Sequence, residues 1–308
     1  MASFCTYFRS WTLSLALIAG FSLLVGCEED VTAVLGTDRP FTLYGVVSPQ
    51  LDSQWVRVFP VEGLLEPASG DKLDARFTST ELESGEEHVW RDSVILDALD
   101  QQAHVFWAPF RAEYGRTYRL EVSRPNGDET TVEVTVPPRA EIVLRPPAVS
   151  STSVVLPVLI EGAAPRLLRL EVMYTVAYVR AGSEQPVSDN VVISYDGAQE
   201  ETAEGWLIPV LPAMDFETVG EVITQRIDHP LDRNMGIALL NLTLRLVVGN
   251  EEWNPPDGIF DPARLVQPET MTNVENGFGF VGAGYRLEES WLPPDEVIEA
   301  ARFRVQPD

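Results

Sequence analysis

The chain has 308 residues, with 47 Asp and Glu against 22 Lys and Arg, and its formal net charge is −25. Such an acidic surface repels nucleic acid and anionic lipid headgroups, so nucleic acid is not expected as a partner. Abundant Val, Leu and Thr, 23 Pro and 21 Gly, and few long helical patterns predict a mainly β fold of two β-sandwich-like domains. One or two short helices are expected in the second domain.

The first 26 residues form a distinct segment. Arg9 is their single charged side chain, and residues 11–25 carry no ionisable group. This pattern is typical of a signal peptide, and the uncharged run is short for a membrane span, which needs about 20 apolar residues. Residues 1–26 are therefore predicted to be a signal peptide.

The segment ends in Leu24, Gly26 and Cys27, which resembles the lipobox of bacterial lipoproteins. The resemblance implies cleavage between Gly26 and Cys27, a diacylglyceryl group on the Cys27 thiol, and a further acyl chain such as palmitate on the new amino terminus. The alternative is an ordinary signal peptide followed by an incidental cysteine. Cys5 is the only other cysteine, so an acylated Cys27 leaves no disulfide to hold the fold.

Residues 27–39 are expected to be an acidic tether. Glu28, Glu29 and Asp30 directly follow the cysteine. Acidic residues at this position resemble a surface-export signal of Bacteroidetes lipoproteins, and a solvated linker is the equal alternative. The sequence leaves open which leaflet or face of the outer membrane the protein reaches.

An N-terminal β-sandwich domain is predicted over residues 40–137. Residues 117–122 and 132–136 alternate apolar and polar side chains on either side of the turn signal Asn126-Gly127, which predicts a hairpin. A terminal hairpin of this form, followed by two prolines, resembles the ending of immunoglobulin-like and fibronectin-type modules.

A Pro-rich connector at 138–147 is predicted to lead into a C-terminal β-rich domain over 148–308. Within that domain, Leu168, Leu170, Val172, Tyr174, Val176 and Tyr178 are expected to share one face of a strand. Residues 215–227 have helical spacing of apolar side chains with Asp215 as the N-cap, and a second short helix is expected from 294 to 301.

The segment from Asn273 to Ala283 has the pattern Asn-x-x-x-Gly-x-Gly-x-x-Gly. Together with the lipobox and two β domains, it resembles outer-membrane lipoproteins of Bacteroidetes that form a domain-of-unknown-function family. Members are often encoded beside TonB-dependent receptors, so the resemblance implies such a receptor as partner. Its glycines are expected to allow a close backbone approach or a bulge.

A partner or ligand surface is predicted on the segment that includes Trp253, Phe260, Phe278 and Tyr285. Loops on a rigid β scaffold often carry binding residues, and Trp and Tyr contribute strongly to interfaces. If the segment binds, Trp253 and some of the other three should be exposed together on one face. The alternative is that these aromatic side chains plug the end of a sandwich.

No catalytic or metal site is predicted. His88, His104 and His229 lack metal-ligand spacing, and the sequence has no Gly-x-Ser-x-Gly motif. Asp257 and Asp261 could supply oxygen ligands to Ca²⁺, but the loop lacks the EF-hand pattern, and an acidic turn without metal is the preferred interpretation. No cofactor is expected.

These observations predict a lipid-anchored outer-membrane lipoprotein that acts as a non-enzymatic binding or accessory component, alongside a TonB-dependent receptor. An envelope hydrolase acting on glycan or peptide and a structural or adhesion module are the alternatives.

Overall fold

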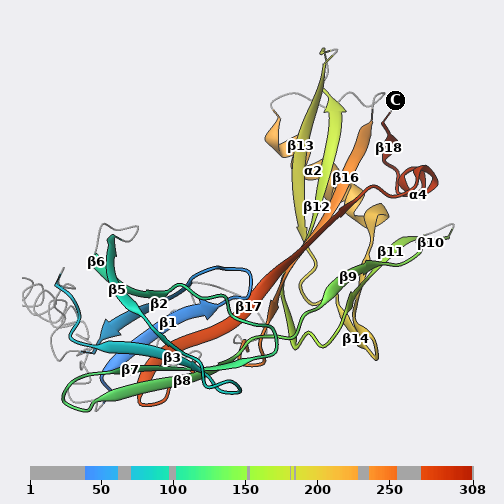
Figure 1. The fold of residues 1–308 in the computed structure, drawn as a ribbon. Coiled ribbons are helices and arrows are strands. Elements are labelled where there is room, and N and C mark those ends of the chain that lie inside the picture. Colours follow the sequence, from blue (N-terminus) through green and yellow to red (C-terminus); the bar gives the residue numbers. More distant parts are fainter. Residues whose placement is uncertain are drawn as a thin grey trace, which may run out of the picture. The chain divides into compact units, whose positions relative to one another are not determined.

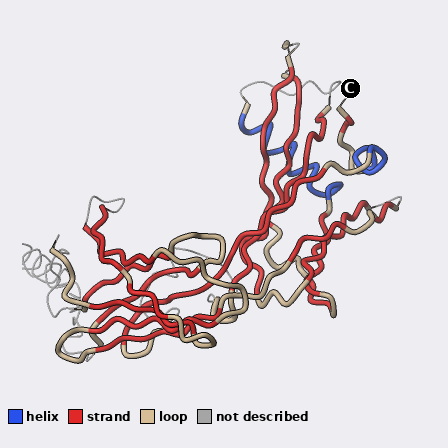
Figure 2. The backbone as a smooth tube through the Cα atoms, viewed as in Figure 1, coloured by secondary structure: helices blue, strands red, loops and turns tan. Residues whose placement is uncertain are grey.

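The protein is described by a computed structural model that covers residues 39–306 except 62–70, 97–101, 151–152, 181, 184, 228–235 and 255–271. The predicted mainly β architecture is confirmed (Figure 2). Within the described ranges, no helix is both long and apolar enough to span a membrane.

Nine of the described strands form one sheet (Figure 1). Across the sheet its strands are β13 (Pro186–Ser194), β12 (Arg166–Val179), β16 (Ile237–Gly249), β17 (Gly277–Trp291), β1 (Phe41–Val47), β2 (Gln54–Pro60), β6 (Gln102–Ala108) and β5 (Arg91–Leu96), and β18 (Arg304–Val305) pairs with β16.

Two smaller sheets and two helices complete the described fold. One sheet contains β4 (Glu87–Val89), β3 (Arg76–Glu81), β7 (Thr117–Ser123) and β8 (Glu129–Thr135). The other contains β10 (Ala148–Val149), β11 (Val154–Glu161), β15 (Gly205–Val210) and β14 (Glu200–Thr202), with β9 (Glu141–Leu144) beside β11. The helices are α2 (Pro212–Arg226) and α4 (Asp295–Ala300).

The N-terminal core lies between the sheet of β1, β2 and β6 and the sheet of β3, β7 and β8. The predicted hairpin is confirmed: Thr117 pairs with Thr135 and Ser123 with Glu129, with Gly127 at φ 93° in the turn. Alternation along the strands directs every second side chain into the core. Its fully buried members include Phe41, Leu43, Val56, Val58, Phe77, Phe106, Leu120 and Val134.

Strand β17 takes part in both halves of the large sheet. Residues Gly277 to Ala283 pair in parallel with β1, and Gly284 to Trp291 pair antiparallel with β16. Consequently Val281 and Ala283 belong to the N-terminal core. Most residues of that core lie within 40–137, the range predicted for the first domain, but these two come from the far end of the sequence. The division of the chain at 138–147 stays a prediction.

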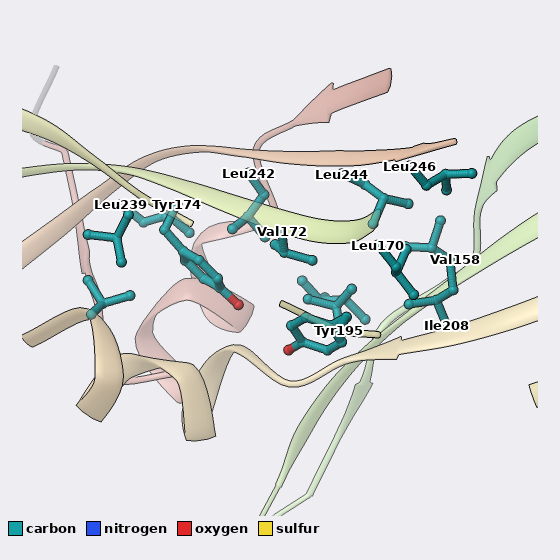
Figure 3. Close-up of a cluster of buried hydrophobic side chains, with 14 of the residues drawn as sticks. Val158, Leu170, Val172, Tyr174, Tyr195, Ile208, Leu239, Leu242, Leu244 and Leu246 are labelled. Carbon is teal, nitrogen blue, oxygen red and sulfur yellow. The ribbon is translucent and has the colours of Figure 1, made fainter. Parts of the chain in front are cut away.

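The C-terminal core is built on one face of β12 and β16. Leu170, Val172, Tyr174, Val176 and Tyr178 are all buried there, as the alternation predicts. Figure 3 shows the labelled side chains of both strands directed toward α2 and β15. Val219 and Ile223 of α2 complete this core with no exposed surface.

Leu168 does not share this face, and the prediction that it does is wrong. The register between β12 and β16 shifts between Leu168 and Glu171, and Arg169 has φ 51°. This β-bulge reverses the alternation, so Leu168 lies in a separate small cluster with Trp253 and Phe280.

The predicted helices are present with different ends. Helix α2 begins at Pro212, after Leu211, and no side chain caps it, so the prediction that Asp215 is the N-cap is wrong. Proline suits the first turn of a helix because its missing N–H would have no partner there. Helix α4 begins at Asp295 after Pro294, with Asp295 and Glu296 in its first turn.

Candidate functional site

The outer face of β1, β2, β5, β6 and the first half of β17 lies opposite the N-terminal core. We call it the aromatic face. Because side chains alternate along a strand, the neighbours of the core residues point to this side. Its defining residues are Tyr44, Val46, Trp55, Arg57, Phe59, Arg91, Trp107, Phe278 and Phe280.

Two tryptophans occupy one end of the aromatic face. Trp55 and Trp107 are cross-strand partners on β2 and β6, and their rings stack with centroids 5.6 Å apart. The Arg91 guanidinium lies 5.2 Å from the Trp107 ring centre, and the Trp107 indole donates to Ser93 Oγ at 3.1 Å. Trp55 stays 47% exposed, so a large apolar ring is available on this surface.

Further arginines lie over the remaining rings. The Arg57 guanidinium is 5.0 Å from the Phe59 ring centre, and that of Arg39 is 4.6 Å from the Phe278 ring centre. In such cation–π pairs the positive charge is attracted to the face of the ring. None of the described strand residues that point to this side is acidic, although acids outnumber basic residues twofold in the whole chain.

A groove of about 480 Å³ adjoins the aromatic face at Val46. Its floor is formed by the backbone at Gly284 of β17 and by Val247 of β16, and its walls by the loop after β1, the bulge of β12, and Trp253. The other lining residues are Ser48, Gln50, Leu51, Leu168, Arg169, Tyr285 and Arg286. Among the described residues that line it, two are arginines and none is acidic.

The loop wall of the groove is fixed by two glutamines. Gln54 is completely buried; its Nε2 donates to the carbonyl of Ser48 at 3.0 Å and its Oε1 accepts the Ser48 N–H at 2.8 Å. Gln50 donates to the Arg286 carbonyl at 2.7 Å and accepts the Arg286 N–H at 2.9 Å. The loop is therefore tied to the main chain of β17.

Trp253 forms the opposite wall because two glycines leave room for its ring. A Cβ on Gly282 would lie 2.7 Å from Trp253 Cε2, and one on Gly249 would lie 2.9 Å from Trp253 Cδ1. The indole donates to the Ala283 carbonyl at 3.1 Å, and the ring packs edge-on against Phe280 with centroids 5.0 Å apart. The close backbone approach predicted for the glycines of residues 273–283 is found at Gly279, where an added Cβ would lie 2.1 Å from the Leu43 carbonyl oxygen.

The structure corrects the predicted partner surface. Trp253 is only 9% exposed and Tyr285 only 2%, so the prediction that the aromatic side chains of this segment are exposed together is wrong for these two. Phe278 is half-buried on the aromatic face. Phe260 lies outside the described residues, as do Gly26, Cys27, Asp257 and Asp261.

Tyr285 has a structural contact that explains its burial. Its hydroxyl donates to the Pro138 carbonyl at 2.6 Å and accepts the Ala140 N–H at 2.7 Å. Burial raises the pKa of Tyr285 to about 12, so the hydroxyl keeps its proton at neutral pH. Tyr285 thus anchors the predicted connector to β17.

Sequence reasoning missed the tryptophan pair of the aromatic face, Trp55 and Trp107. Trp55, Arg57 and Phe59 alternate with the buried Val56 and Val58, and that period was the available signal. It could not show that Trp107 lies beside Trp55, because the two strands are separated by more than forty residues in the sequence.

The described histidines make local contacts. His104 Nδ1 lies 3.0 Å from Asp92 Oδ1 inside the sheet, and the His88 ring stacks on Phe110 with centroids 4.1 Å apart. His229 lies outside the described residues. Within the described ranges, no group of three or more His, Cys, Asp or Glu side chains could hold a metal ion.

A buried polar cluster in the C-terminal core contains a carboxylate. Asp215 accepts hydrogen bonds from the hydroxyls of Tyr174 and of Tyr195, the latter at 2.5 Å, and the Tyr195 oxygen accepts the Leu211 N–H at 2.8 Å. Burial raises the pKa of Asp215, while the two hydroxyl bonds lower it. These hydrogen bonds dock α2 on the sheet, and Figure 3 shows the two tyrosine rings on the side of the sheet that faces the helix.

Comparison of the chain with protein-family models and with curated proteins gave no match.

Proposed function

We propose that the protein is a lipid-anchored component of a bacterial outer membrane that binds a partner protein and has no enzymatic role. The lipobox at Cys27 supports the anchor, and the observation that carries the binding role is the aromatic face. Interface centres are enriched in Trp, Tyr, Phe and Arg and depleted in acids, which is the composition of this face.

The exposure of the aromatic face supports a protein partner. Trp55 is 47% exposed and Val46 is 41% exposed, and both lie on the same side of the large sheet. Large apolar side chains that gather on a folded protein commonly mark an interaction site. A tryptophan braced by a neighbour, as Trp55 is by Trp107, has little freedom to lose when it is buried by a partner.

The partner we propose is a TonB-dependent receptor, as the resemblance to Bacteroidetes lipoproteins implies. The receptor is expected to place acidic side chains opposite Arg57 and Arg91. A rigid face of rings and guanidinium groups suits such an interface because Arg pairs with carboxylates through two parallel hydrogen bonds.

Copurification from membranes tests this function. Tagged wild-type protein should retain a TonB-dependent receptor identified by mass spectrometry, and Trp55→Ala should lower the receptor yield about tenfold or more, the effect of losing an interface hot spot. Val192→Ala is the matched control, because Val192 is 49% exposed on the outer strand β13. Equal receptor yields from all three proteins, or none from the wild type, would exclude the proposal and leave the hydrolase and the adhesion module as alternatives.

A further inference from the structure

We propose that the groove beside the aromatic face binds a single-chain organic anion, an acyl chain that ends in a carboxylate. This is a second binding site, beyond the partner-binding function proposed above. Three properties of the groove support this: its apolar walls, the two arginines that line it and the contacts that hold its walls.

The apolar side chains of the walls form a contact surface for an acyl chain. Leu51 is 48% exposed and Val46 is 41% exposed at the rim, while Leu168 and Trp253 reach the groove from the small cluster beneath it. Each methylene removed from water strengthens binding about fourfold. A volume of about 480 Å³ lies within the range of small-molecule sites, roughly 300–1,000 Å³.

The arginines supply the charge that selects an anion. Arg169 and Arg286 both line the groove, and none of the described residues that line it is an Asp or a Glu. Among the described residues, no Asp or Glu lies within ion-pair distance of the Arg286 guanidinium. A guanidinium presents parallel donors that match the two oxygens of a carboxylate. A cationic amphiphile would find the same walls but would be repelled by both groups.

The position of Arg169 supports a role for its side chain. Its φ of 51° is a left-handed conformation that is unfavourable for a residue with a Cβ and that glycine adopts freely. Strain of this kind gathers at functional positions. The bulge turns Leu168 toward Trp253 and places the next residue, Arg169, at the groove.

Two sets of contacts hold the groove in shape. Gln50 and Gln54 fix one wall, and the glycines under Trp253 fix the other. A site that needs no rearrangement does not spend binding free energy on ordering its walls. Gly284 also lines the groove, and an added Cβ there would lie 2.8 Å from the Val248 carbonyl oxygen, so its backbone packs closely against β16.

The test is titration of the full-length Cys27→Ser chain, which keeps anchor acyl chains out of the assay, with dodecanoate below its micelle concentration. Calorimetry and tryptophan fluorescence should both report saturable binding of one ligand per chain. Dodecyltrimethylammonium has the same tail and the opposite charge, and acetate has the same headgroup without the tail. Both should bind at least tenfold more weakly, since a hydrogen-bonded charge and a buried chain each contribute more than a tenfold factor.

Three variants locate the site. Arg286→Gln and Arg169→Gln should each weaken dodecanoate binding about tenfold through loss of a charge-assisted hydrogen bond. Leu51→Glu should abolish it, because an exposed rim residue then brings a carboxylate into the groove. Val192→Glu, which adds the same charge on β13, should bind like the parent chain.

Several results would overturn the proposal. Equal affinity for the cationic amphiphile, unchanged affinity in both arginine variants, or binding that does not saturate would each do so. Binding to phosphatidylglycerol vesicles that is lost in the same arginine variants would assign the groove to a membrane surface instead. Receptor copurification with Leu51→Glu separates the two proposals: retained receptor without dodecanoate binding shows that the groove and the aromatic face act independently.

Discussion

Gly282 and Gly220 are glycines at which an added methyl group meets very different surroundings. A Cβ on Gly282 would lie 2.7 Å from Trp253 Cε2 and 2.8 Å from Phe280 Cε1. Gly282→Ala is therefore expected to displace the indole and to destabilise the fold by about 1–3 kcal/mol, the usual cost of overpacking. Thermal unfolding measures the loss, and reduced dodecanoate binding would follow from a displaced groove wall.

Gly220→Ala is the matched substitution with the opposite expected sign. Gly220 lies inside α2, and a Cβ there would meet only Ile237 Cδ1, at 3.8 Å. Glycine in a helix interior costs roughly 0.5–1 kcal/mol relative to alanine, so this variant should be more stable than the wild type by about that amount. Equal melting temperatures for the two variants would contradict the packing described around Trp253.

Asp215 predicts a pH dependence of stability. Burial raises the pKa of this carboxyl above its ordinary value of 3.8, although the hydroxyls of Tyr174 and Tyr195 donate to it and lower the pKa. A group whose pKa is higher in the folded chain stabilises the fold fully below the pKa of the unfolded chain. That stabilisation is lost as the pH rises through the folded value.

Asp215→Asn removes this titration while its side-chain oxygen can still accept both hydroxyl bonds. The melting temperature of the variant relative to the wild type should therefore rise between about pH 3 and about pH 7. Asp215→Ala leaves two buried hydroxyls without this acceptor and should be destabilised at every pH, by about 1–3 kcal/mol for each unpaired group. If the difference in melting temperature between Asp215→Asn and the wild type stays constant with pH, the Asp215 carboxyl is not the source of the pH dependence.

At the scale of elements, β17 determines whether the N-terminal core is complete. Its first half pairs with β1 along seven residues, Glu275 bridges to Thr131, and Val281 and Ala283 enter the core. Without β17, strand β1 becomes an open edge, which exposes unpaired main-chain groups.

A fragment of residues 38–139 is therefore expected not to fold cooperatively by itself. The same fragment joined by a flexible linker to residues 273–291 should regain a cooperative unfolding transition, because it recovers both the paired strand and the missing core residues. Near-ultraviolet circular dichroism and chemical denaturation report the difference. A cooperative transition in the fragment alone would show that residues 40–137 are an independent domain, as the sequence predicts.

At the scale of the whole molecule, the anchor is the property to test. The acyl chains implied at Cys27 would each contribute about 0.8 kcal/mol per buried methylene, and two or more chains give stable attachment. The wild-type protein should sediment with membranes, and Cys27→Ser should move it to the soluble fraction. A matched Cys5→Ser variant should stay with the membranes. A Cys27→Ser protein that still sediments and partitions into detergent would exclude lipid anchoring.

The sequence by itself determined the local features of this protein. Alternation of apolar and polar residues predicted the hairpin of β7 and β8 and the buried face from Leu170 to Tyr178, because a strand has a period of two whatever its neighbours are. The mainly β class followed from the same signal. The apolar spacing predicts the helix at 212–226 but places its start three residues late. The helix begins at Pro212 because proline is favoured in the first turn, where its missing N–H would have no partner.

Only the tertiary structure decided which faces are exposed and what lies beside them. The sequence predicts Trp253 on the surface, but its ring is buried against Gly249 of β16 and Gly282 of β17. No local sequence pattern shows that these two glycines leave room for the ring. The bulge at Arg169 turned Leu168 to the other face, since one extra residue reverses a strand's alternation. The aromatic face and the groove combine residues from β1, β2, β6, β12 and β17. Their meeting depends on strand pairings between distant parts of the chain, which the order of residues along any one strand does not encode.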